Sequence, residues 1–279
     1  MLELVVDPTQ LAAIAEELTP LPAAVLRLNE LVFSEAPSVR EIEDVVAFDP
    51  ALAAAVLQGA NSAMYARQRS ASTVRDAILR IGTTGLAGVA MRMATADEMR
   101  ADLPMYGMAS GALLDHAVRS ATAAEALRRH VPAKVPAPAT VAALLHDTGK
   151  LVLSRFVGNR FAALVADLAT EDDHELWLLE REVFGADHAT VAVHLGRHWR
   201  LPPAIVDGMV NHHEPANGTA VAHTVHVANA IAAATVGRTC GSAASVRESL
   251  DQLTIEPTAF AQLCAQTVEM LDLNPLAAG

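Results

Sequence analysis

Apolar residues recur three and four positions apart along most of the chain, which is the periodicity of helices that bury one face. No segment shows a sustained alternation of apolar and polar residues, so the signal for β-strands is weak throughout. Alanine, the residue with the highest helix propensity, is abundant, and aromatic residues make up only 4% of the chain. The pattern predicts an all-α protein.

Capping signals mark the starts of two helices in the N-terminal part. Ser38 with Glu41 three residues later has the form of a capping box. Asp49 followed by Pro50 has the form of an N-cap with proline at the first helical position. The second signal predicts a helix over 50–58, ending near the glycine that follows.

Glycine and proline divide the rest of the chain into segments. A helix is expected over 73–81, stopped by Gly82, and another over 86–99. The proline, glycine and serine residues of 104–111 mark the clearest internal break. A proline-rich loop is expected over 130–140.

Composition narrows the class of protein. The chain has 279 residues with a formal net charge of −12 at pH 7, which argues against nucleic acid as a partner because such binding depends on neutralising phosphates. Two distant cysteines, Cys240 and Cys264, indicate neither a disulfide framework nor a thiolate zinc site. The N-terminus lacks the features of a signal peptide, and no uncharged apolar run of about 18 residues is present. We expect a soluble cytoplasmic protein without a membrane partner.

The stretch VAALLHDTGKL at 141–151 places His146, Asp147 and Lys150 inside an apolar run. Burying an ionised side chain costs several kcal/mol, roughly, unless the side chain is paired or bound. These residues therefore either find partners or mark a site. Gly149, between them, allows the close approach of another backbone.

All 11 histidines lie after the break at 104–111. One helical stripe, expected to face inward, consists of His188, Val191, Ala192, Leu195 and Trp199. His116 shares an inward face with small residues. His194 and His198 are four residues apart but lie off the stripe, so we expect them to face solvent.

Imidazole and carboxylate groups are the usual ligands of zinc, iron, nickel and manganese, and a site needs several of them from different helices. A lone inward histidine is more often a core residue bonded to a backbone carbonyl than a ligand. Six such groups are harder to explain in that way. The candidate ligands for one or two divalent transition-metal ions are His116, His146, Asp147, His188, His212 and His213.

The chain resembles HDOD proteins, a bacterial signalling family whose name stands for HD-related output domain. In the N-terminal part the resemblance rests on LPAAVLRLNEL, FDPALAAAVLQGANSAMY and VRDAILRIG. In the C-terminal part it rests on His116, LLHDTGKL, FGADHATVA and RLPPAIVDGMVNHHEP. The similarity runs from about Leu18 to Pro215. An HD dipeptide alone is weak evidence, whereas the ordered set is specific.

The resemblance implies an all-helical fold in two lobes, of which the C-terminal lobe is similar to the HD-domain phosphohydrolases. The N-terminal lobe is expected over 1–110 and the HD-like lobe over 111–216. A helical extension over 217–279 is expected to pack on the HD-like lobe. It contains two expected helices within 245–273, which would cover that lobe or contact another subunit.

The resemblance also implies a site. In catalytic HD relatives the HD pair binds metal with an upstream histidine and a downstream aspartate, and HD-GYP phosphodiesterases have an HDxGK motif, a later histidine and an HH pair. Many HDOD proteins have lost some of these positions and are regarded as non-catalytic. The closing aspartate is replaced here by Asn229, a neutral and poorer ligand, unless His223 or His226 on the same helix substitutes. The GYP motif is absent, which argues against specific hydrolysis of cyclic di-GMP.

Two functions remain open. The first is a non-catalytic signal-transduction module that binds a protein partner, or a small-molecule or nucleotide ligand, and uses the histidines as a structural or sensory metal site. The second is a metal-dependent HD-type phosphohydrolase or phosphodiesterase, in which metal-bound hydroxide attacks phosphorus and Lys150 stabilises the phosphoryl oxygens. A salt bridge to Asp147 is the alternative role of Lys150. The family resemblance and Asn229 favour the regulatory module.

Two further segments carry polar or aromatic residues without an assigned role. Asn61, Ser62 and Tyr65 are expected to cap and pack helices, with ligand binding as the less favoured alternative. Trp177 and Leu178 are expected to anchor their helix to the core.

Overall fold

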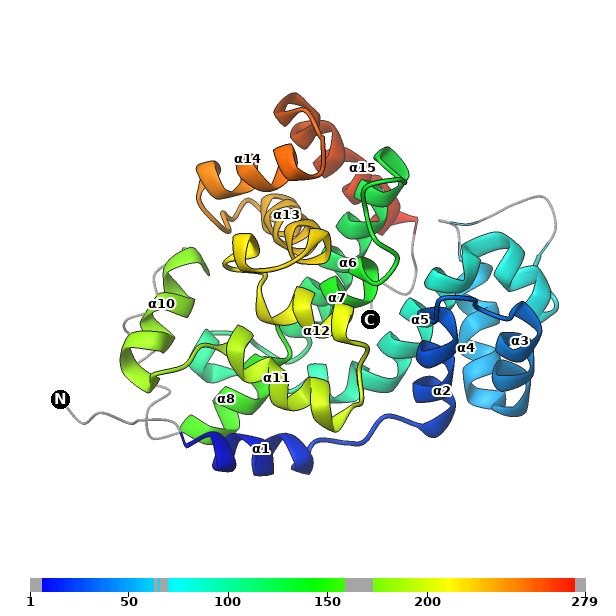
Figure 1. Ribbon diagram of the computed structural model, residues 1–279, viewed down its shortest axis with the longest axis horizontal. Coiled ribbons are helices and arrows are strands. Elements are labelled where there is room, and N and C mark those ends of the chain that lie inside the picture. Colours follow the sequence, from blue (N-terminus) through cyan, green and yellow to red (C-terminus); the bar gives the residue numbers. More distant parts are fainter. Residues whose placement is uncertain (1–6, 63–64, 66–69, 159–172, 274–279) are drawn as a thin grey trace.

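The computed structural model describes residues 7–62, 65, 70–158 and 173–273. Within these ranges the chain is helical apart from turns, loops and one isolated β-bridge between Leu103 and Met108. The prediction of an all-α protein is therefore confirmed. The helices form two lobes, at the right and the left of Figure 1.

Four consecutive helices build the smaller, N-terminal lobe. They are α2 (Ala23–Val32), α3 (Val39–Phe48), α4 (Pro50–Ala60) and α5 (Val74–Met99). Helix α4 packs along α5, and α2 packs against both α3 and α5. Helix α5 also contacts the larger lobe and so joins the two.

The larger, C-terminal lobe contains most of the other helices in the described part of the chain. They are α6 (Ala112–His130), α7 (Ala139–Leu145), α8 (Gly149–Val157), α10 (Asp173–Phe184), α11 (His188–His198), α12 (Pro203–Val210), α13 (Ala220–Ala234), α14 (Ala243–Gln252) and α15 (Phe260–Asp272). Three single 3₁₀ turns are η2 (Pro104–Tyr106), η3 (Pro215–Asn217) and η4 (Pro257–Ala259). The two helices expected within 245–273 are present as α14 and α15.

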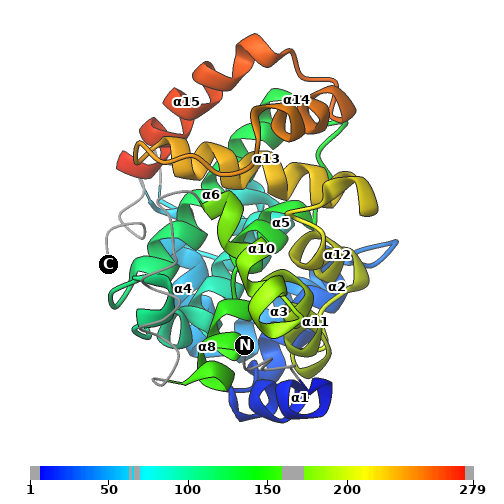
Figure 2. The same cartoon turned by 90° about the vertical axis from the view of Figure 1, so that its left-hand side faces the viewer.

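Helix α13 occupies the middle of the C-terminal lobe. It packs along α6 and contacts α7 and α12 on the same side. Helices α14 and α15 pack on its outer side, and α15 also contacts α6 (Figure 2). Almost every residue of α13 is buried, which fits a helix that is covered all round.

The predicted helix starts in the N-terminal lobe are confirmed. The Ser38 hydroxyl accepts a hydrogen bond from the Glu41 N–H at 3.3 Å. The Asp49 carboxylate accepts two bonds from the first turn of α4, each 3.0 Å long. Side-chain oxygens at these positions satisfy N–H groups that have no partner within the helix.

Gly82 interrupts α5 as the sequence predicted. Its backbone angles, φ 72° and ψ 169°, are not helical, and glycine adopts a positive φ at little cost. The helix resumes directly after Gly82, so the predicted start of the next helix at 86 is wrong. The break at 104–111 and the loop at 130–140 separate α5, α6 and α7 as expected.

Helix α1 (Pro8–Glu17) precedes the four helices of the N-terminal lobe but lies outside it, and it packs on α8 and α11 of the C-terminal lobe (Figure 1). Two bonds fix the segment that follows it. His198 Nε2 bonds the Leu18 carbonyl at 3.0 Å, and the buried Trp199 indole N–H donates to the Thr19 carbonyl at 3.1 Å. The expectation that His198 faces solvent is therefore wrong, because a segment distant in sequence covers that side of α11.

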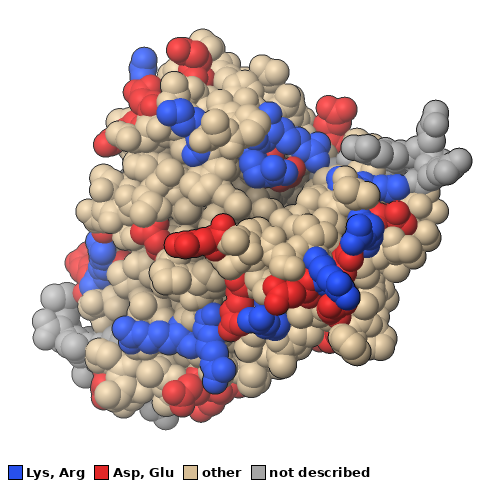
Figure 3. All heavy atoms as spheres, turned by 45° about the vertical axis from the view of Figure 1, so that its right-hand side comes forward, with Lys and Arg blue, Asp and Glu red and all other residues tan. Residues whose placement is uncertain are grey.

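No helix in the described ranges combines the length and the apolar character needed to cross a membrane. On the face shown in Figure 3, acidic and basic side chains are interspersed, and no continuous basic surface is visible. A phosphate backbone would find no broad positive surface on this face.

Candidate metal centre

The HD motif lies in the tight turn between α7 and α8. His146 and Asp147 follow the last residue of α7 directly, and the Thr148 hydroxyl donates to the Leu145 carbonyl at 2.7 Å. Gly149 then begins α8 against the start of α11. A Cβ atom at Gly149 would lie 1.8 Å from the His188 carbonyl oxygen, so the close approach predicted at this glycine is present.

Three of the six predicted ligands meet at this turn, and we call them the first group: His116, His146 and Asp147. The Nε2 atoms of the two histidines are 3.3 Å apart, and each lies 3.5 Å from Asp147 Oδ2. His116 reaches the turn from α6, on the inward face that periodicity predicted.

The other three predicted ligands form the second group: His188, His212 and His213. His188 begins α11, whereas His212 and His213 follow the end of α12. The Nε2 atoms of His188 and His213 are 3.0 Å apart. The inward stripe predicted for α11 is buried along its whole length, which orients His188 toward the interior.

Asp147 joins the two groups into one cluster. Its Oδ2 atom faces the first group, while its Oδ1 atom lies 3.2 Å from His188 Nε2 and 3.8 Å from His212 Nε2. The imidazole rings of His146 and His212 meet edge to face, with centroids 4.8 Å apart. All six residues predicted from the sequence are thus brought together around a single buried carboxylate.

Hydrogen bonds at Nδ1 orient three of the histidines. His146 Nδ1 lies 2.8 Å from the Ala143 carbonyl and His212 Nδ1 lies 2.7 Å from the Met209 carbonyl. A carbonyl only accepts, so Nδ1 donates, and the neutral ring has its lone pair on Nε2. His188 Nδ1 is held by a carboxylate oxygen of Glu180 at 2.7 Å. Metal-binding histidines commonly have such a partner on the second nitrogen.

The donor set fits a transition metal. Pairs of Nε2 atoms face each other in both groups, and the buried Nε2 atom of His212 has no hydrogen-bond partner in the described part of the chain. Buried nitrogens are normally paired, and a cation among them would satisfy these lone pairs together. Imidazole with carboxylate suits zinc, iron, nickel and manganese.

Electrostatics favour the protonation states that bind metal. Burial lowers the pKa of His146 to about 4 and holds the pKa of His212 well below its usual range. Burial alone would raise the pKa of Asp147, but the neighbouring imidazoles of His146 and His188 and the ammonium group of Lys150 outweigh it and hold that pKa well below its usual range. Asp147 is therefore ionised, and His146 and His212 are neutral near pH 7, as ligands must be.

His188 differs from these histidines. Burial lowers its pKa, but the carboxylate of Glu180, with a further contribution from Asp147, raises it to about 9. Without a metal, His188 thus carries a proton between two carboxylates.

The family model of the HDOD domain matches residues 18–215. The chain belongs to the HDOD family. This range contains both lobes as far as η3 and all six residues of the cluster. No curated protein matches the sequence.

Several solved structures share this HDOD fold. A Shewanella amazonensis protein named "Putative phosphohydrolase" is 24% identical with a TM-score of 0.68, and the match covers 94% of this chain and 96% of that one. A Geobacter sulfurreducens "HDOD domain protein with unknown function" is 22% identical with a TM-score of 0.68, covering 95% and 99%. A Marinobacter aquaeolei "Putative signal transduction protein" is 19% identical with a TM-score of 0.72, covering 97% and 65%. At these identities the likeness shows the fold.

Lys150 lies beside the histidine cluster, and its side chain is buried. Its ammonium group lies 2.7 Å from Asp147 Oδ2 and 5.5 Å from the centroid of the Tyr106 ring. The salt bridge considered from the sequence is therefore present. Both partners are buried, so the pair neutralises two charges that would be costly to bury singly.

Asn229 lies on α13 beside His116. Burial lowers the pKa of His116, whereas the Asp147 carboxylate and a hydrogen bond with the Asn229 side chain raise it. The Oδ1 atom of Asn229 is buried and has no hydrogen-bond partner among the described residues. The position assigned to the missing HD aspartate therefore faces the first group.

The two histidines considered as substitutes face elsewhere. His226 bonds the His212 carbonyl at 2.7 Å and the Ser245 hydroxyl at 2.9 Å, and His223 bonds the Ser249 hydroxyl at 3.0 Å. His223 connects α13 to α14, and His226 connects α13 both to α14 and to the backbone of His212. Neither imidazole belongs to the two groups of ligand atoms, so substitution by either is wrong.

Helix α10 supports the second group in ways the sequence did not reveal. Trp177 stacks on His213, with ring centroids 5.2 Å apart and planes 9° apart, and Glu180 fixes His188. Trp177 is buried as expected, but Leu178 is 46% exposed, so its predicted anchoring role is wrong. Glu180 is eight residues from His188 and carries no motif, so no sequence signal pointed to it.

Proposed function

We propose that this chain is a regulatory HDOD module whose histidine cluster binds one or two divalent transition-metal ions. The observation that carries the proposal is the convergence of four imidazoles on the two oxygens of Asp147, with a fifth, His213, 3.0 Å from His188 Nε2. The Nε2 atom of His212 has no hydrogen-bond partner among the described residues. A folded core seldom leaves such nitrogens facing one another without a ligand. The metal would have a structural or sensory role.

Two features favour regulation over catalysis. Asp147 Oδ2 is already paired with Lys150, and Asn229 stands where HD enzymes have an aspartate. A neutral amide binds a cation more weakly than a carboxylate does. The module would act through a protein partner of a signalling pathway or through a small-molecule ligand. The similar Marinobacter aquaeolei protein is named a signal transduction protein, which agrees with this class.

Metal-dependent phosphohydrolysis is the second candidate, and a specific observation favours it. Two groups of ligands share a bridging carboxylate, which is an arrangement suited to two metals. Bound metals would supply an activated hydroxide and a Lewis acid. His116 and His213 are partly exposed, whereas the other four residues are buried, so solvent would reach the cluster past these two. Lys150 would have to leave Asp147 to contact a phosphoryl oxygen.

Metal content tests the proposal. We expect protein purified without an affinity tag or chelator to carry at least about half an equivalent of a transition metal. The double variant His146→Ala with Asp147→Ala should lose it, whereas His194→Ala, a histidine on α11 outside the cluster, should keep it. Mass spectrometry of all three proteins measures this. Wild-type protein that stays empty after reconstitution would refute the metal site and with it the hydrolase.

Activity separates the two candidates. Metal-loaded wild type is assayed against phosphomonoester and phosphodiester substrates beside the double variant. The regulatory module predicts no turnover above that of the double variant. Metal-dependent turnover that the double variant lacks would favour the hydrolase instead.

A further inference from the structure

Residues 100–111, the inter-lobe loop, connect α5 to α6 and reach the histidine cluster through the side chain of Tyr106. The loop closes on itself, because the Leu103 N–H donates to the Met108 carbonyl at 2.9 Å and the Met108 N–H donates back at 3.1 Å. Gly107 makes the turn with a φ of 61°, which glycine adopts at little cost. Tyr106 directly precedes this turn, so a closed stretch of backbone fixes its position.

The Tyr106 ring contacts residues that belong to both groups of the cluster or support them. It meets the imidazole of His188 edge to face, with ring centroids 6.4 Å apart and planes at 87°. The Lys150 ammonium group, bonded to Asp147, lies 5.5 Å from the centroid of the same ring. An aromatic ring attracts a cation at this distance. Tyr106 therefore contacts the second group directly and the shared carboxylate through Lys150.

A hydroxyl and a carboxylate oxygen beside His188 are buried without a hydrogen-bond partner in the described part of the chain. They are the hydroxyl oxygen of Tyr106 and Oε1 of Glu180. The other Glu180 oxygen, Oε2, accepts from the His188 N–H and bonds Nδ1 of the same residue, each at 2.7 Å. Burial raises the pKa of Tyr106 well above its usual range and the nearby Glu180 carboxylate raises it further. The hydroxyl therefore lies close to a carboxylate oxygen that lacks a donor, and buried polar atoms are normally paired.

We propose that Tyr106 is a positioning residue of the second group, whose hydroxyl supplies the donor for Glu180 Oε1 and so steadies the carboxylate that holds His188. The inference rests on the proposed metal site and adds a regulatory connection to it. A metal that orders His188 would strengthen the hold of the cluster on the inter-lobe loop. Because coupled equilibria are reciprocal, a partner that pulls the loop away would weaken metal binding in the second group.

Tyr106→Phe tests this connection, because it removes the hydroxyl and keeps the ring against His188 and Lys150. Metal-free, full-length protein is titrated with zinc in a calorimeter, and the step that His212→Ala weakens is assigned to the second group. We expect Tyr106→Phe to weaken this step about three- to tenfold, which is the effect of one hydrogen bond. Circular dichroism checks that each variant keeps its helical content.

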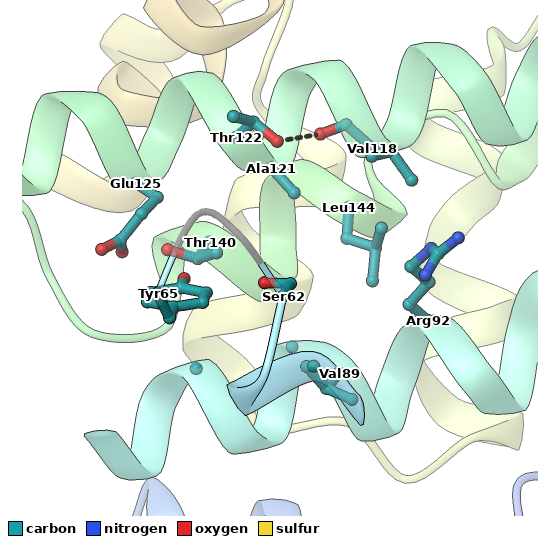
Figure 4. Close-up of a pocket in the computed structure, with 13 residues that line it drawn as sticks. Ser62, Tyr65, Val89, Arg92, Val118, Ala121, Thr122, Glu125, Thr140 and Leu144 are labelled. Atoms are coloured by element: carbon teal, nitrogen blue, oxygen red, sulfur yellow. Dashed lines mark hydrogen bonds between the residues drawn. The ribbon is translucent and has the colours of Figure 1, made fainter. Parts of the chain in front are cut away.

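Tyr65, the other tyrosine of the chain, provides the matched control. It lies near Glu125 and Thr140 at a pocket between the lobes (Figure 4), and the lining of that pocket includes no member of the cluster among the described residues. The Arg129 guanidinium lies 5.5 Å from the centroid of its ring, so the expected packing role holds for Tyr65. Tyr65→Phe removes a similar hydroxyl and should leave metal affinity unchanged.

A double variant separates positioning through Glu180 from a merely structural role. Glu180→Ala removes the carboxylate through which the hydroxyl acts, so Tyr106→Phe should cause no further loss of affinity in that background. Hydrogen exchange gives a second measurement, in which zinc should slow exchange over 100–111 in the wild type and slow it less in Tyr106→Phe.

The outcomes distinguish this inference from the metal site on which it rests. Wild type that binds zinc beside a Tyr106→Phe variant of equal affinity would overturn the inference alone. Losses that multiply in the double variant, or loop exchange that zinc does not change, would overturn it as well. Wild type that binds no metal would refute the metal site and the inference together.

Discussion

The two groups of the histidine cluster share Asp147 but are built differently. The first group contributes two histidines and one oxygen of Asp147, and Lys150 occupies the same oxygen at 2.7 Å. The second group contributes three histidines, and the other oxygen of Asp147 lies 3.2 Å from His188 Nε2. A cation entering the first group must compete with an ammonium group, whereas one entering the second group must displace only a proton.

The surroundings of the groups differ in the same direction. Glu180 orients His188, and Trp177 stacks on His213, so the second group is held by a neighbouring helix. The first group has Asn229 at the position where a carboxylate would complete it. A full set of ligand residues therefore does not make two equal metal sites. We expect one tighter metal in the second group and one weaker metal in the first.

Removal of the shared carboxylate should have the largest effect. Asp147→Ala takes a ligand from both groups and removes the carboxylate that lies 2.7 Å from the buried Lys150 ammonium group. We expect loss of both metals and a decrease of about 3–5 kcal/mol in the free energy of unfolding. Denaturant unfolding and metal content measure the two effects. Retention of one full equivalent of metal would show that Asp147 is not shared.

Single histidine variants test which group binds the tighter metal. His212→Ala should weaken the tighter metal by more than about 100-fold, because a ligand matters more than its supporting residue. His116→Ala should weaken only the binding of the weaker metal, in the first group. Calorimetric titration of metal-free protein with manganese or zinc resolves the two steps. The ranking is wrong if His116→Ala removes the tighter step and His212→Ala leaves it intact.

The supporting carboxylate gives an intermediate effect. Glu180→Gln keeps the shape of the side chain but weakens the bond that orients His188, so metal affinity in the second group should fall about 10–100-fold. Glu182→Gln, an exposed position on the same helix, is the matched control and should leave the affinity unchanged. The same titration measures both, and equal affinities would show that Glu180 has no part in the site.

The smallest expected effect is an increase in metal affinity. Asn229→Asp supplies the missing carboxylate beside His116, and we expect the weaker affinity to rise about tenfold while the tighter one stays constant. In the His116→Ala background the gain should shrink, because the first group is then incomplete. A rise in the tighter step instead would place Asn229 next to the second group.

Sequence reasoning succeeded where the evidence was local. The stripe through His188 follows from the 3.6-residue period of one helix, and the close approach at Gly149 follows from the absence of a side chain. The salt bridge of Lys150 with Asp147 spans three residues along one helical turn. Five of the six candidate ligands were recognisable because they lie in motifs of the family, and His116 was recognisable as an inward-facing histidine upstream of them.

Sequence reasoning failed where distant segments meet. His198 lies off the buried stripe of α11, yet the chain after α1 covers it. Glu180 and Tyr106 contact the cluster from a separate helix and from the inter-lobe break, and neither belongs to a periodic pattern that points there. Such contacts depend on tertiary packing, which a single element does not encode.

Anomalous diffraction from crystals of the protein soaked with manganese or zinc locates each ion and so tests the difference between the two groups. We expect a strong peak among His188, His212, His213 and Asp147 Oδ1. A weaker peak, or one that appears only at higher metal concentration, should lie beside His116 and His146. A cluster without any peak would contradict the metal site. A stronger peak in the first group would contradict the difference between the two groups.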